Sequence, residues 1–242
     1  DDFRGIFMAC RFALIALLAV YGAPCVSAAQ QPASVERVDC AVFAEVEDGV
    51  NAECGILLVP ENRAGPESRM IGVPFARIRS TAAEPAPDPQ MFMTGGPGGR
   101  TIPRLLSSRN PILASRDLIF LEQRGSPLGR PALQCPEYTE AGYQAAIGAL
   151  TAKELANARI EAAKICTARF RAEGGDLAGY TTEAIAADIE LLRKALGIEK
   201  VNLYGLSYSG KVMTTYARDY PASTRSLVLN CPLSVEANYD EY

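Results

Sequence analysis

Ser207 is the residue whose surroundings most clearly suit covalent chemistry. It lies in the segment VNLYGLSYSG, positions 201–210, where a hydrophobic strand pattern runs into a serine that has Gly205 two residues before it and Ser209 two residues after it. Small residues at those positions let a strand and the helix after it approach closely, so that the serine stands on a sharp turn with its hydroxyl exposed. Such a hydroxyl is placed to attack a carbonyl carbon and form an acyl-enzyme. A buried or helix-capping serine is the structural alternative.

Ser209 departs from the glycine that is usual at its position. It adds a hydroxymethyl group where space is expected to be tight, and Gly210 beside it could relieve the crowding. Ser209 is a poor rival nucleophile, because its own positions two residues away are Ser207 and Lys211.

A serine nucleophile also needs a base, and the sequence contains no histidine. Lys211 is the nearest alternative, but it lies four residues after Ser207 and does not meet the Ser-x-x-Lys spacing of serine-lysine hydrolases. A solvated lysine is the simpler interpretation of Lys211.

A glycine cluster, Gly95 to Gly99, follows a short apolar segment over residues 91–93. Backbone amides in such a loop can point at an oxygen that becomes negative during acyl transfer, and we expect the amides of Gly96 and Tyr208 to be these donors. A phosphate cradle is disfavoured because the Gly-Lys-Ser or Gly-Lys-Thr ending is missing. A tight loop that merely turns the chain is the structural alternative.

Strand and helix patterns alternate along the chain and would position these residues. Residues 30–37 form a polar stretch. Thr182 is expected to cap the helix over residues 182–196. The strand nearest the C-terminus is expected to be buried. The closing order of strand, helix, strand, helix, strand predicts an α/β fold with a mostly parallel sheet. The expected strands cover 55–59, 70–78, 91–93, 118–121, 200–204 and 226–229, and the expected helical segments cover 139–173, 182–196 and 209–219.

Composition narrows the classes of function. The 242 residues are 48% hydrophobic and carry a net charge of −4, with lysines and arginines scattered along the chain. That is enough apolar sequence for one sizeable core, and it lacks the basic patch that a phosphate backbone requires, so nucleic acid is not an expected partner. There is no CxxC spacing, so the sequence predicts no metal site, and it predicts no cofactor.

Residues 1–28 predict an upstream extension followed by a signal peptide. Met8 opens a short region that carries Arg11, the run over 12–20 is almost wholly apolar, and small residues follow it. A membrane anchor is the alternative, but the apolar run ends before the roughly 20 residues that a spanning helix needs. A lipoprotein signal at Cys25 is a weaker alternative. We therefore expect a secreted or periplasmic protein with no stable membrane span after cleavage.

Five cysteines remain beyond the expected signal peptide, and an oxidising compartment favours disulfides among them. Cys40 with Cys54, and Cys135 with Cys166, would each close a loop between segments expected to be neighbours, leaving Cys231 over. Buried thiols that never pair are the alternative.

Three motifs in this order give the chain a specific resemblance to a known family. They are MTGGPGG at Met93 to Gly99, LEQRGSP at Leu121 to Pro127, and YGLSYSG at Tyr204 to Gly210, followed by a Tyr-Ala-x-x-Tyr-Pro run at Tyr216 to Pro221. Together they resemble the α/β-hydrolase branch that contains prolyl iminopeptidases and tripeptidyl aminopeptidase-like enzymes. The resemblance covers Cys40 to the C-terminus.

The resemblance implies that Ser207 is the nucleophile, that the Gly95-Gly96 region and Tyr208 form the oxyanion hole, and that Glu122 to Gly125 packs beneath that loop. Thr94 and Glu122 stand where many relatives carry histidine and aspartate. Glu122 and Arg124 are expected to form a structural pair that shapes the turn.

In this fold the catalytic acid and histidine follow the serine along the chain. We therefore expect residues 29–242 to be the N-terminal part of an α/β-hydrolase domain, with the lid, the acid and the histidine elsewhere. The expected function is that of an exported serine hydrolase that releases residues from peptide N-termini. The alternatives are an esterase or amidase acting on small substrates, and a non-catalytic binding protein of the same fold.

Overall fold

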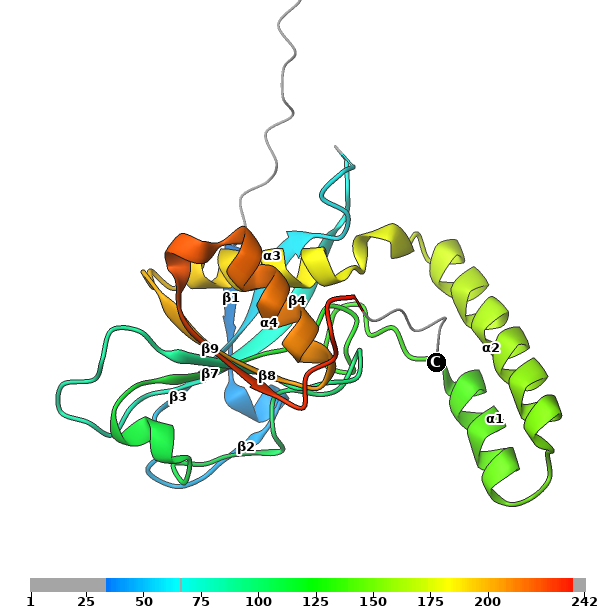
Figure 1. The fold of residues 1–242 in the computed structure, drawn as a ribbon, viewed down its shortest axis with the longest axis horizontal. Helices are drawn as coiled ribbons and strands as arrows, with labels where there is room; N and C mark the ends of the chain where they lie inside the picture. Colours follow the sequence, from blue (N-terminus) through cyan, green and yellow to red (C-terminus); the bar gives the residue numbers. More distant parts are fainter. Residues whose placement is uncertain (1–33, 66, 237–242) are drawn as a thin grey trace, which may run out of the picture.

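The central feature of the fold is a mixed seven-stranded sheet (Figure 1). The computed structural model describes residues 34–65 and 67–236. The strand order is β1-β3-β4-β7-β5-β8-β9. Strands β1, β3, β4 and β7 pair antiparallel, and β7, β5, β8 and β9 pair parallel. The sheet strands are β1 Ser34–Val38, β3 Ala52–Pro60, β4 Met70–Ile78, β5 Gln90–Met93, β7 Leu118–Leu121, β8 Val201–Leu206 and β9 Thr224–Asn230, and a small parallel pair joins β2 Glu45–Val46 to β6 Leu105–Leu106.

Two of the α-helices cover one face of the sheet, and the other two form a separate hairpin. Helices α3 and α4 lie together over the sheet, whereas α1 and α2 run antiparallel to each other and project away from it (Figure 1). None of the helices in the described part of the chain combines the length and apolar composition that crossing a bilayer requires. The helices are α1 Pro136–Ala146, α2 Ala152–Ala172, α3 Thr182–Ala195 and α4 Tyr208–Asp219, with short 3₁₀ turns η1 Cys40–Val42, η2 Pro111–Ala114, η3 Leu177–Gly179 and η4 Pro221–Ser223.

The main core lies between the sheet and the α3–α4 layer. Ile189 and Leu192 of α3 and Met213 of α4 are fully buried there, against inward-facing residues of the central strands such as Met91 and Leu203. A second cluster fills the opposite face behind β3, β4 and β7, where η1 and the segment from Ile102 to Leu113 cover the sheet. Strand β4 reads as almost continuously apolar because both of its faces are covered.

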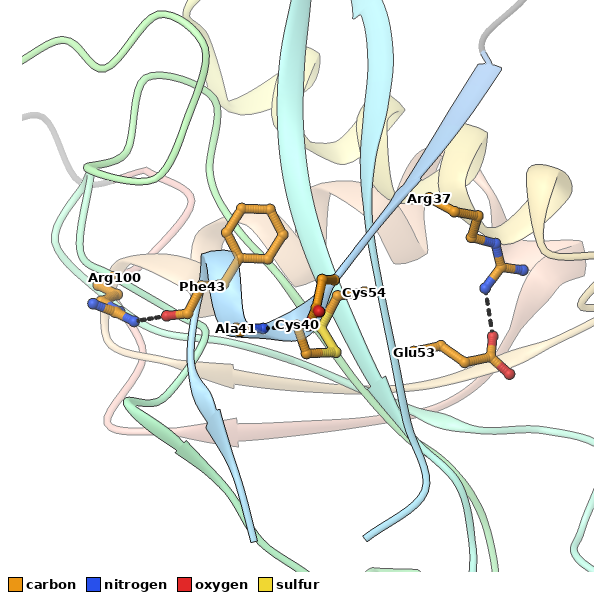
Figure 2. The surroundings of a disulfide bond; sticks show 8 residues. Arg37, Cys40, Ala41, Phe43, Glu53, Cys54 and Arg100 are labelled. Atoms are coloured by element: carbon orange, nitrogen blue, oxygen red, sulfur yellow. Dashed lines mark hydrogen bonds and ion pairs between the residues drawn. A yellow bond between two sulfur atoms is a disulfide. The ribbon is translucent and has the colours of Figure 1, made fainter.

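Two disulfides link peripheral segments covalently to the rest of the fold, and both match the predicted pairs. Cys40 on η1 bonds to Cys54 on β3 (Figure 2), and Cys135 bonds to Cys166, which ties the start of α1 to α2. Cys231 is free, as the sequence predicted, and it is exposed.

Most predicted elements are present, with four differences. The polar stretch before Val38 contains an edge strand, because β1 pairs with β3 along its whole length while most of its side chains remain exposed. The long helical segment is two helices with a turn between them. Helix α3 is capped by Thr181 and not by Thr182, since the Thr181 hydroxyl accepts the amide of Ala184 at 3.2 Å.

The fourth difference concerns burial of the last strand. Strand β9 was expected to be buried, but Val228 is 49% exposed and Leu229 is 40% exposed. In the described residues β9 pairs with β8 on one side only and lies at the edge of the sheet, which accounts for this exposure. The predicted signal peptide over residues 1–28 lies outside the described residues.

Candidate active site

Ser207 stands on the turn between β8 and α4 in a backbone conformation that non-glycine residues rarely adopt. Its φ and ψ are 57° and −121°, and its side chain is exposed although the three residues after it are buried. Such a conformation costs about 1–3 kcal/mol and persists only when the surroundings impose it. The turn is tightly packed around Ser207, since a Cβ at Gly205 would meet Ser209 O at 2.8 Å and Gly210 N at 2.9 Å. The turn therefore presents the Ser207 hydroxyl at the carboxyl end of the central strands.

Ser209 supports the turn through its hydroxyl. Its Oγ donates to the carbonyl of Met93 at 2.6 Å and accepts the amide of Leu206 at 2.7 Å, and the residue is fully buried. This one side chain therefore links the ends of β5 and β8. The hydroxymethyl group, expected to be crowded at this position, is instead held by hydrogen bonds.

The glycine loop packs directly against the Ser207 side chain. A Cβ added at Gly95 would lie 2.7 Å from Ser207 Cβ and 3.0 Å from its Oγ, so only glycine lets the two segments approach this closely. Gly96 and Gly98 have φ values of +121° and +79°, which L side chains rarely adopt. The structure thus brings the predicted residues Gly95, Gly96, Ser207 and Tyr208 into one region at the ends of adjacent strands β5 and β8.

Gln123 and Glu122, which follow β7, hold the glycine loop from below. Gln123 Nε2 donates to the carbonyls of Thr94 and Gly95 at 2.9 and 3.0 Å, and its Oε1 accepts the amide of Gly98 at 2.8 Å. Glu122 Oε1 accepts the amides of Thr101 and Ile102, at 2.8 and 2.7 Å.

The Glu122 carboxyl is fully buried, and burial raises its pKa despite the hydrogen bonds from those two amides. At the far end of the loop, Arg100 Nε donates to Ile102 O at 2.8 Å, and its guanidinium also reaches the carbonyl of Phe43 (Figure 2). The loop is therefore anchored along its length by side chains from outside the run of glycines.

Arg124 does not pair with Glu122, which corrects the expectation from the sequence. Its guanidinium makes a bidentate contact with Asp188 on α3, at 2.8 Å for both bonds, and donates to the carbonyls of Glu61 and Gly179 at 2.6 Å. Both charged side chains are buried, so the pair joins the turn after β7 to α3 and to the β3–β4 connection. Sequence reasoning missed Asp188, because this contact spans 64 residues.

A cavity of about 730 Å³ opens beside the glycine loop. Pro97 and Gly98 line one side of it, Gly125 lies in its wall, and Leu133 and Glu140 lie toward the start of α1. Within residues 34–65 and 67–236, no group of three or more histidine, cysteine, aspartate or glutamate side chains could hold a metal ion.

Comparison with known proteins places this arrangement in a family. The family model described as alpha/beta hydrolase fold matches residues 92–241, which include the glycine loop and the Ser207 turn. Tripeptidyl aminopeptidase of Streptomyces coelicolor is 26% identical over 221 residues, covering 86% of this chain and 40% of that protein. Serine protease Hip1 of Mycobacterium tuberculosis is 27% identical over 192 residues, covering 74% of this chain and 35% of that protein.

Among solved structures, a "probable hydrolytic enzyme" of Pseudomonas aeruginosa aligns with a TM-score of 0.45 at 15% identity, covering 76% of this chain and 42% of that one. The chain spans about two fifths of the length of the first curated relatives that it matches, at 40% of each. The matched family model, which extends over most of the sequence, shows that the chain belongs to the alpha/beta hydrolase fold family.

Proposed function

We propose that Ser207 is the nucleophile of a serine hydrolase. The observation that carries this proposal is the strained turn at φ 57°, which exposes the hydroxyl where the backbone of Gly95 packs against it. In the proposed reaction Ser207 Oγ loses its proton to a base and attacks a substrate carbonyl. The bond to the leaving group then breaks, the leaving group takes up the proton, and water releases the acyl group.

The amides of Gly96 and Tyr208 are the proposed donors to the oxyanion. Tyr208 is the first residue of α4, so its amide lies at a helix N-terminus, where the backbone dipoles favour negative charge. Gly96 follows the glycine that touches the Ser207 side chain. Hydrogen bonds from fixed donors to the developing negative charge are usually the largest single contribution to rate enhancement in acyl transfer.

The base and its acid partner are proposed to come from a part of the full-length protein outside this sequence. The 242 residues contain no histidine. The chain matches only 40% of the length of the tripeptidyl aminopeptidase of S. coelicolor, which leaves room for further catalytic segments. In this fold the acid and the histidine follow the serine along the chain.

Peptides with a free N-terminus are the proposed substrates. The names of the relatives support this, since one is a tripeptidyl aminopeptidase, one is a serine protease, and a third, from S. coelicolor, is a probable proline iminopeptidase. Ester or amide substrates are the alternative within the same chemistry.

Export is proposed as well. The two disulfides support an oxidising compartment. The expected signal peptide over residues 1–28 supports the same location. N-terminal sequencing of the mature protein should begin near residue 29, and a mature protein that retains the apolar run over 12–20 would contradict cleavage.

A pair of matched peptide substrates tests the proposed activity in the full-length enzyme. Tripeptidyl-aminomethylcoumarin with a free amine should be hydrolysed, the same compound with an acetylated amine should be a much poorer substrate, and Ser207→Ala should abolish turnover of both. Hydrolysis of simple aryl esters without either peptide would favour the esterase alternative. Turnover that survives Ser207→Ala would remove Ser207 as the nucleophile.

A further inference from the structure

The glycine loop beside Ser207 has little side-chain support of its own. Gly95, Gly96 and Gly98 have no side chains, and glycine has the largest backbone freedom of any residue. A backbone hydrogen bond within the run, from Gly99 N to Gly95 O, is long at 3.3 Å. A loop that must hold an amide in place before the reaction therefore needs support from elsewhere.

Gln123 provides that support through three hydrogen bonds from one side-chain amide. Two carbonyls, of Thr94 and Gly95, face its Nε2, and the amide of Gly98 faces its Oε1, all at 2.8 to 3.0 Å. Because two of these loop groups accept and one donates, only one orientation of the side-chain amide satisfies all three. A carboxylate in its place would offer only acceptors to the two carbonyls.

The contact is shielded from water and lies close to the reacting group. Gln123 is 1% exposed, so solvent does not compete for these bonds. One of its acceptors, Gly95, is the residue whose Cα packs against the Ser207 side chain, and Gly96 is the next residue along the loop. A displacement of the loop would therefore move the Gly96 amide relative to Ser207 Oγ.

We propose that Gln123 is a positioning residue for acyl transfer, which sets the oxyanion loop against Ser207 through its hydrogen bonds to Thr94, Gly95 and Gly98. This inference rests on the proposed function of Ser207. It assigns Gln123 no contact with the substrate, so its effect falls on the transition state and not on ground-state binding.

Two variants of the full-length enzyme test the proposal. Gln123→Glu keeps the size of the side chain and removes the donors, and Gln123→Leu removes all three hydrogen bonds. Each should lower kcat and the rate of fluorophosphonate labelling of Ser207 by about 10–100-fold, with KM little changed, because small displacements near the reacting atoms have effects of this size. Gln144→Leu is the matched control, since the side chain of that glutamine donates to Glu140 on the exposed surface of α1, away from the glycine loop.

A folded Gln123→Glu or Gln123→Leu enzyme with unchanged kcat and labelling rate would overturn the proposal, and so would a loss that appears only in KM. If neither variant folds, hydrogen exchange on the unmodified protein decides. The Gly98 amide should be strongly protected, and rapid exchange there would also overturn the proposal. Failure of the unmodified enzyme to label at Ser207 would instead contradict the proposed function. The exchange rate of the Gly98 amide would still report whether Gln123 holds the loop.

Discussion

Ser209 shows how a single residue departs from a common pattern without losing the geometry that the pattern serves. Glycine at this position usually allows strand and helix to approach closely. Here the added hydroxyl becomes a link, because it donates to Met93 O and accepts from Leu206 N at 2.6 and 2.7 Å. The turn that carries Ser207 is thereby tied to the strand from which the glycine loop emerges.

Ser209→Ala should therefore destabilise the protein by about 1–3 kcal/mol, because it leaves a buried carbonyl and a buried amide without their partner. Urea unfolding of the full-length protein, followed by circular dichroism, measures this change. Ser226→Ala is the control. The Ser226 hydroxyl is exposed on β9 and donates to Asn202 of β8, so its loss should change the free energy of unfolding by less than about 0.5 kcal/mol. A free energy of unfolding that Ser209→Ala lowers no more than the control does would mean that the Ser209 link contributes nothing.

At the scale of elements, α3 and α4 are joined by a buried carboxylate. Glu190 of α3 receives a bidentate contact from Arg193 at 2.7 and 2.8 Å and the hydroxyl of Tyr216 of α4 at 2.9 Å. Ser223 of η4 donates to the same carboxylate at 3.2 Å. This cluster fixes α4, which begins directly after Ser207, against α3, the helix that carries Asp188.

The same cluster predicts a pH dependence of stability. Burial alone would raise the pKa of Glu190, but the hydrogen bonds from Arg193, Tyr216 and Lys194 outweigh it and lower the pKa from 4.5 to about 2. Because the folded pKa lies below the unfolded one, this stabilisation is present above about pH 4.5 and is lost as the pH falls toward 2. The difference corresponds to on the order of 3 kcal/mol.

Glu190→Gln should remove that part of the acid sensitivity. The free energy of unfolding of the full-length protein, measured by urea titration between neutral pH and about pH 2, should fall less steeply in the variant than in the unmodified protein. Glu183→Gln, which removes an exposed carboxylate from the same helix, is the matched control. Parallel curves for Glu190→Gln and the unmodified protein would contradict the account of this cluster.

Across the whole molecule, the sequence predicts best what depends on local patterns. The strands over 70–78 and 118–121 have the predicted bounds, because buried strands carry dense apolar sequence that both neighbours and core reinforce. Strand Ser34–Val38 was missed because its residues are largely polar and exposed, and its order comes from pairing with β3. The exposure of β9 depends on which elements flank the sheet, and no local pattern reveals that.

The candidate site divides in the same way. The proximity of Gly95 to Ser207 could be predicted, because parallel neighbouring strands bring their carboxyl ends to one edge of the sheet. The resemblance also placed Glu122 to Gly125 beneath the glycine loop, but the individual bonds that this turn makes could not be predicted. Gln123 contacts a loop 25 to 29 residues away, and Arg124 contacts Asp188 64 residues away, so these bonds depend on the complete fold.

The central claim is that the turn at residue 207 carries a reactive serine, and active-site labelling tests it most directly. The full-length protein would be treated with a fluorophosphonate and digested with trypsin, and the peptide 201–211 would be sequenced by mass spectrometry. The account predicts one adduct, on Ser207 and not on Ser209, that is lost on heat denaturation before labelling and absent from Ser207→Ala. A folded full-length protein whose Ser207 remains unmodified would contradict it.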